Sequence, residues 1–250
     1  ELPQQHPYQR MLRAYMATLT EQDFAHGVTE KLTAEPPDPD PEVQYRNYIL
    51  TLTQQPLVGT KRGAPSINAP ARLFTLDVIE GEKGVMVPPL WPEALISFVQ
   101  WDYPGNPYHD NRALKMRTFV TGAVNLMMLD DHLTKNPGAG RSDWFSYQLV
   151  YWGAAYPGFK DLLPAEVQNA YVTALRRHAE RILEWGVRGE EPNLDMTAPV
   201  GLWYAAQAVD DPEFTKRVEL RAEMQFADPR YFHPAGYFVE RGGVDMGFQG

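Results

Sequence analysis

The sequence predicts an all-α protein, and three observations support this prediction. Apolar residues recur at three- and four-residue spacing through most of the segment from Asn111 to Phe226. Prolines and glycines, which end helices and begin turns, stand where that spacing is interrupted. The helical spacing is lost from Asp228 to Gly250, so turns and a short strand are expected only there and in loops.

The first third of the chain alternates predicted helix with irregular segments. His6 to Leu19 places tyrosine, methionine and leucine on one helical face, which predicts a helix. Alternating prolines from Glu35 to Pro41 exclude a helix, because proline lacks a backbone donor and pushes its neighbours into extended conformations. Glu42 to Leu52 can form a short helix. Gln55 to Ala71 is rich in Pro, Gly, Ser and Asn, which predicts a long loop of the kind that often lines a site.

The rest of the chain up to Phe226 is predicted to be a series of helices. The longest of them carries a wide apolar stripe and should be buried on more than one side. Ser142 is a candidate cap, Pro164 fits the first turn of the following helix, and Gly186 fits its end. The predicted helices are Pro92–Val99, Asn111–Leu133, Ser142–Ala155, Pro164–Trp185, Met196–Val209 and Pro212–Phe226.

Short loops between these helices predict antiparallel neighbours, and therefore a succession of helical hairpins in a single domain over residues 1–250. Hairpins placed side by side can close into a toroid. No sequence repeat distinguishes a toroid from an irregular helical bundle, so helical spacing alone leaves both arrangements open.

Composition excludes several classes of function. The formal net charge of -9, from 32 acidic and 23 basic residues, would repel a nucleic acid, so no nucleic-acid partner is expected. The chain has no cysteine, which excludes disulfides, cysteine-bound zinc and thiol nucleophiles. No run of about 18 apolar residues is present, so no membrane span is expected. A local group of Arg and Asn can still bind an anionic sugar.

The ends of the sequence suggest where the protein acts. It begins Glu1-Leu2-Pro3, without an initiator methionine, which is typical of a chain whose signal peptide has been removed or of one shortened for expression, and the first of these favours export. A secreted or periplasmic location is therefore expected. We also expect a further domain or a second chain to pack at the C-terminal end, after Gly250.

The C-terminal tail is rich in residues that could form a site. Residues 231–250 combine five glycines with His233, Tyr237, Glu240, Arg241 and Asp245. Glycine lets a backbone fold tightly around a ligand, so these residues could form a site loop. A solvated loop at the chain end explains the same composition equally well.

Part of this tail resembles a known family. The run Gly236-Tyr237-Phe238-Val239-Glu240, followed by Gly242-Gly243-Val244-Asp245 and Phe248, is similar to a loop of polysaccharide lyases of the heparinase II/III, alginate lyase and chondroitin lyase kind. This resemblance implies an (α/α) toroid and β-elimination on a uronic acid, without a cofactor. The implied substrate is a uronic-acid-containing polysaccharide.

The resemblance also implies roles for individual residues. Tyr237 or His233 would transfer the proton, and Arg241 and Asn193 would hold the uronate. Glu240 and Asp245 would bind the substrate. Asn193 could instead cap the following helix. That helix carries Trp203 and Tyr204, whose rings could stack on sugar, although core packing uses the same residue types.

Two other functions remain open. A glycoside hydrolase of similar fold would use Glu240 and Asp245 as acid and base, and a non-catalytic glycan-binding protein would use aromatic side chains. No metal site is expected, because His132 has no partner at ligand spacing. His178 is interpreted as a core residue, and the adjacent acids Asp130 and Asp131 as solvated.

Overall fold

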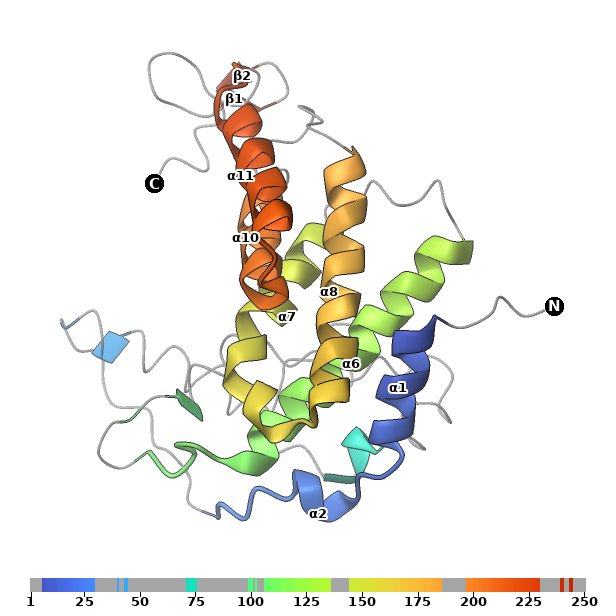
Figure 1. Ribbon diagram of the computed structural model, residues 1–250. Coiled ribbons are helices and arrows are strands. Elements are labelled where there is room, and N and C mark those ends of the chain that lie inside the picture. The colour runs from blue at the N-terminus through green and yellow to red at the C-terminus, as the bar shows by residue number, and fades with distance from the viewer. Residues whose placement is uncertain are drawn as a thin grey trace. The chain divides into compact units, whose positions relative to one another are not determined.

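A computed structural model describes part of the chain and shows a predominantly helical protein (Figure 1). The described residues are 6–29, 40, 43–44, 71–75, 99–100, 102, 106–135, 144–185, 197–229, 239–240 and 243–244. The chain divides into two compact units, one formed by Glu1–Asn125 with Ala155–Ala170, the other by Leu126–Ala154 with Tyr171–Gly250. The all-α prediction is confirmed for the described part. The single-domain prediction is not tested by this division.

The first unit begins with helix α1, Pro7–Met16, which confirms the helix predicted between His6 and Leu19. The His6 imidazole caps it by accepting the Tyr8 N–H at 3.4 Å, and Pro7 occupies the first turn. One face of α1 is buried, including Leu12 at 0% exposure. The amphipathic spacing in the sequence thus corresponds to a helix that buries one face, as expected.

Short helices follow α1 in the first unit. Helix α2, Glu21–Phe24, begins where the Thr20 N–H donates to the Asp23 carboxylate at 2.8 Å. Its Phe24 ring packs 5.8 Å from Phe74 of the 3₁₀-helix η1, Ala71–Phe74. A second 3₁₀-helix, η2, spans Lys160–Leu162.

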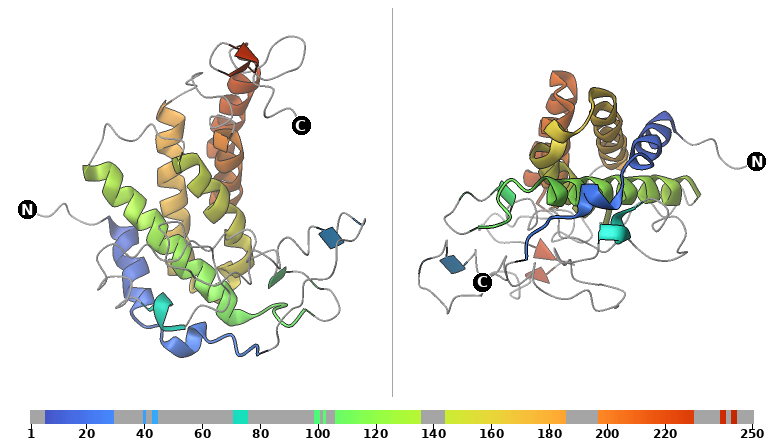
Figure 2. Two further views of the ribbon diagram at one scale, coloured as in Figure 1. Left: turned by 180° about the vertical axis from the view of Figure 1, so that it is seen from behind. Right: turned by 90° about the horizontal axis from the view of Figure 1, so that it is seen from below.

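Helix α6, Arg112–Lys135, is the longest described helix, and the boundary between the units falls inside it. Figure 2 shows α6 from two further sides as one continuous helix. In the first unit the Phe119 ring lies 5.7 Å from Tyr15 of α1 and 5.8 Å from Phe159. Buried residues occupy several sides of α6, including Leu114, Met116 and Val120. The prediction that this helix is buried on more than one side is confirmed.

Helices α7, Trp144–Phe159, and α8, Ala165–Trp185, also cross the boundary between the units. The predicted helix begins at Pro164, whereas α8 begins one residue later, at Ala165. The Pro164 carbonyl, just before the helix, accepts the Val167 and Gln168 N–H groups. Proline fits there because the α8 backbone needs an acceptor at this position and not a donor.

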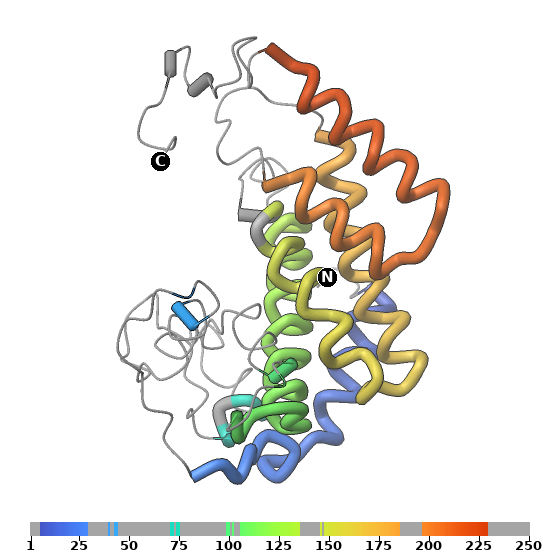
Figure 3. Tube along the Cα trace, turned by 90° about the vertical axis from the view of Figure 1, so that its left-hand side faces the viewer, coloured from blue at the N-terminus to red at the C-terminus, as the bar shows by residue number. Residues whose placement is uncertain are grey.

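The second unit ends its helical part in an antiparallel hairpin of α10, Thr197–Val209, and α11, Pro212–Phe226 (Figures 1 and 3). The turn holds Asp210 at a positive φ of 51°. Both predicted helices and the predicted hairpin are confirmed. Beyond them, strands β1, Val239–Glu240, and β2, Gly243–Val244, pair antiparallel. None of the helices in the described part of the chain has the length and apolar character needed to cross a bilayer.

Helix α10 packs closely on α7 through glycine. A Cβ built on Gly201 would lie 2.7 Å from the Ser146 carbonyl oxygen and 3.0 Å from the Leu149 Cβ. A Cβ on Gly153 of α7 would lie 2.8 Å from the Tyr204 Cβ. Backbone therefore meets backbone here, and only glycine fits without movement.

Gly201→Ala is accordingly expected to lower the free energy of unfolding by about 1 to 2 kcal/mol, because forcing α10 away from α7 costs about 2 to 3 kcal/mol and the higher helix propensity of alanine recovers only about 1 kcal/mol. Urea unfolding monitored by circular dichroism measures this. Ala208→Gly on the half-buried side of the same helix is the matched control, since helix propensity alone should cost about 1 kcal/mol there. An unchanged or raised midpoint for Gly201→Ala would contradict the close packing.

Candidate functional site

The structure describes side chains for only two of the predicted site residues, Trp203 and Tyr204 on α10. For Glu240 it describes the backbone, which pairs with Gly243 in the β1–β2 hairpin. The remaining predicted residues lie outside the described residues: Asn193, His233, Tyr237, Arg241 and Asp245. The roles that the resemblance implies for these residues therefore stay predictions.

Trp203 presents an aromatic surface to solvent. Its side chain is 51% exposed, and its ring lies edge to face with Tyr204, with centroids 5.1 Å apart and planes at 69°. Val200, one turn earlier on the same face of α10, is 47% exposed. An exposed indole supported by a second ring provides a flat apolar face of the kind on which a sugar ring can stack.

The opposite face of α10 explains why Trp203 stays outside. That face consists mainly of small residues and is buried against the rest of the second unit: Ala198, Gly201, Leu202, Ala205 and Ala206. Close packing through small residues leaves no space for an indole. Tyr204 is half-buried beside Gly153, so the ring that supports Trp203 is fixed by the same contact.

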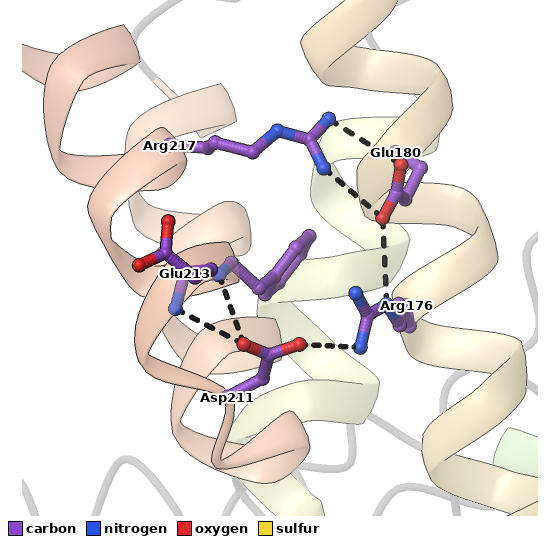
Figure 4. A network of polar contacts seen from close by, with 6 residues as sticks. Arg176, Glu180, Asp211, Glu213 and Arg217 are labelled. Carbon is purple, nitrogen blue, oxygen red and sulfur yellow. Dashed lines mark hydrogen bonds and ion pairs between the residues drawn. The ribbon is translucent and has the colours of Figure 1, made fainter.

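An ion-pair network joins the α10–α11 hairpin to α8 (Figure 4). Arg176 Nη1 donates to Asp211 Oδ2 at 2.8 Å, and Arg217 donates to both Glu180 oxygens at 3.2 and 3.3 Å. Arg176 Nε also reaches Glu180 at 3.4 Å. Arg176 and Arg217 both lie over the Phe214 ring. The network fixes the position of α11, and with it the hairpin that carries Trp203.

Asp211 has two roles in this network. Its Oδ1 accepts the Glu213 and Phe214 N–H groups at 3.0 and 3.2 Å and thereby caps α11, while Oδ2 accepts from Arg176. The hydrogen bond from the Phe214 N–H, followed by the bond from Arg176, lowers the pKa of the Asp211 carboxyl. The ionised form is therefore the one that the hairpin stabilises.

A second polar cluster is buried between α6 and α8 in the second unit. Asp130 Oδ1 accepts from Arg177 Nε at 2.9 Å and from Arg181 Nη2 at 2.6 Å. The Asp130 side chain is only 4% exposed. The prediction that Asp130 is solvated is therefore wrong, because α8 brings two guanidinium groups one helical turn apart to this carboxylate.

His178 lies beside this cluster and is buried, at 1% exposure. Its Nε2 is 3.0 Å from the Leu126 carbonyl oxygen, so Nε2 carries the proton that the carbonyl accepts. Burial, partly opposed by this hydrogen bond, lowers the pKa of His178 to about 4. The interpretation of His178 as a core residue is confirmed.

Comparisons with known proteins do not assign the chain to a family. No protein-family model, no curated protein and no solved structure matches it. Within the described residues, no group of three or more His, Asp and Glu side chains is arranged to hold a metal ion. Function therefore has to be inferred from the sequence and from the geometry described above.

Proposed function

We propose that the protein is a polysaccharide lyase that cleaves a uronic-acid-containing polysaccharide by β-elimination. The observation that carries this proposal is Trp203, an exposed indole on a helix that is otherwise tightly packed through small residues. Trp203 and the neighbouring Val200 form an exposed apolar surface, and sugar rings have apolar faces that match it. Such an enzyme acts outside the cytoplasm, where its polymer is found.

The proposed reaction assigns the chemistry to the residues of the tail and of the α8–α10 connection. A base, Tyr237 or His233, removes the proton from the carbon next to the uronate carboxylate. Arg241 and Asn193 stabilise the negative charge that develops on that carboxylate. The glycosidic C–O bond then breaks, its oxygen takes a proton, and a carbon–carbon double bond remains on the sugar.

We also propose that the helical hairpins belong to an (α/α) toroid. Supporting this, Leu220 and Met224 lie one turn apart on the outer side of α11 and are 56% and 57% exposed. In a toroid, each hairpin buries such a face against the next hairpin. Further helices, from the same polypeptide or a second chain, would cover these two residues.

The proposed role of Trp203 gives a direct prediction. Trp203→Ala should raise KM for an acidic polysaccharide about tenfold and change kcat little, because stacking holds substrate and transition state alike. Turnover is measured by the ultraviolet absorbance of the unsaturated uronate product. Trp203→Phe should recover most of the affinity.

Met128→Ala is the matched control, since Met128 is also about half exposed, at 50%, but is not aromatic and lies on α6. Its kinetics should equal those of the unaltered protein. Reducing ends released without product absorbance would indicate a hydrolase instead. Binding without any turnover across a panel of acidic polysaccharides would indicate a glycan-binding protein, and either result would refute the lyase proposal.

A further inference from the structure

The first unit contains a polar hollow of about 380 Å³ between α2 and the beginning of α6. A volume of this size is at the lower end of ligand sites and can hold a sugar residue. Its lining is mostly polar and includes a guanidinium, a carboxylate, an imidazole and two amides: Thr20, Gln22, Asp23, Ala25, His26, Asn111, Arg112 and Ala113.

The walls of the hollow are held in place by two side chains, one from α6 and one from the residue that precedes it. Arg117, almost fully buried, donates from Nε to the Phe24 carbonyl at 2.8 Å. Asn111 donates from Nδ2 to the His26 carbonyl at 3.0 Å, and the positive φ of Gly27, 69°, lets the chain turn immediately afterwards. Two long-range hydrogen bonds thus fix the backbone on either side of Ala25, as a preorganised site requires.

Arg112 and Asp23 carry opposite charges on the surface of the hollow and do not form an ion pair with each other. Within the described part of the chain, no ion pair engages the exposed Arg112 guanidinium. The Asp23 carboxylate accepts from the Thr20 N–H and hydroxyl at 2.8 and 3.1 Å through one oxygen, Oδ2. Burial raises the pKa of the neighbouring Tyr15 phenol, while the charge of Arg112 lowers it and that of Asp23 raises it, so both charges are close to this ring.

This combination favours one chemical class of ligand. A guanidinium binds a carboxylate through two parallel hydrogen bonds. A carboxylate such as Asp23, together with Gln22, suits sugar hydroxyls, whereas it would repel a multiply charged phosphate or sulfate. We infer that the hollow is a subsite for one uronic acid residue, with its carboxylate on Arg112 and its hydroxyls on Asp23 and Gln22. The identification of the sugar rests on the proposed function.

The test is a calorimetric titration of the 250-residue chain with an oligogalacturonate and with the methyl ester of the same oligomer. Esterification removes the charge and keeps the ring, so the ester should bind about tenfold more weakly. Arg112→Gln should weaken binding of the acid form about tenfold and leave binding of the ester unchanged.

Arg72→Gln is the matched control, because Arg72 is an exposed arginine of the first unit that does not line the hollow. It should leave both affinities unchanged. The NMR chemical shifts of the Ala25 and Ala113 backbone amides should change when the acid oligomer is added to the unaltered protein. They should not change when it is added to Arg112→Gln. Equal binding of acid and ester, equal effects of the two arginine substitutions, or no binding at all would overturn the inference.

These outcomes separate the subsite from the lyase activity. Charge-dependent binding at Arg112 without an unsaturated product would support the proposed subsite and contradict the proposed lyase activity. Formation of unsaturated product with identical KM in Arg112→Gln and Arg72→Gln would support the proposed lyase activity and contradict the proposed subsite.

Discussion

Asp130→Asn is expected to destabilise the protein by about 3 kcal/mol, because it removes the buried negative charge that two arginines share. Breaking a buried ion pair typically costs about 3 to 5 kcal/mol, since the remaining charge stays without compensation. Here the lower value applies, because the Arg177 and Arg181 side chains are 37% and 20% exposed and water can hydrate them in part. Urea unfolding at neutral pH measures the change.

Asp131→Asn provides the matched control at the adjacent position, with the same chemical change on a side chain that is only half-buried. It should cost less than about 1 kcal/mol, as expected for a partly solvated charge. Pairing Asp130→Asn with Arg181→Met should recover part of the loss, because the second change removes one of the uncompensated charges. Equal stability of Asp130→Asn and Asp131→Asn would show that the cluster contributes nothing.

Helical periodicity carried most of the information about the described fold. It located α11 to the residue, Pro212–Phe226, because Asp211 and Pro212 are strong signals for a helix start. It also located α1, α6, α8 and α10 to within a few residues. Boundaries were less accurate where a helix continues through residues that usually end one, as in α7, which passes Ala155 and Pro157 and ends at Phe159.

Long-range pairing was the part that the sequence did not reveal. Asp130 and Arg177 are 47 residues apart, and nothing local to Asp130 indicates that α8 will face it. A usable signal was present on α8, where Arg177 and Arg181 repeat at i and i+4 beside the buried His178. Two half-buried arginines on one side of a helix favour a carboxylate partner.

The hollow of the first unit was missed for a related reason. His26 and Asn111, which are 85 residues apart, come together only because α2 packs at the beginning of α6. From the sequence, Asn111 suggests no more than a helix start, and its Oδ1 does accept the Leu114 N–H at 3.2 Å. The second hydrogen bond of the same amide, to the His26 carbonyl, is a tertiary contact that no spacing rule predicts.

The stability of the protein is expected to fall on mild acidification, because His178 must be neutral in the folded state. Its pKa is about 4 in the fold against 6.5 in an unfolded chain, so between these values the unfolded chain binds more protons. The free energy of unfolding should therefore be independent of this group above about pH 7.5. It should decrease by about 2.5 kcal/mol between about pH 7.5 and 4.5.

His178→Gln isolates this contribution. The glutamine amide can donate to the Leu126 carbonyl as the Nε2–H does, but it does not titrate. The variant should therefore lose about 2.5 kcal/mol less than the unaltered protein over the same pH interval, as measured by urea unfolding at each pH. Below about pH 4 both proteins should weaken further, because the lowered pKa of Asp211 makes its ionised form part of the native hairpin. Parallel pH profiles for the two proteins would mean that the protonation of His178 does not oppose folding.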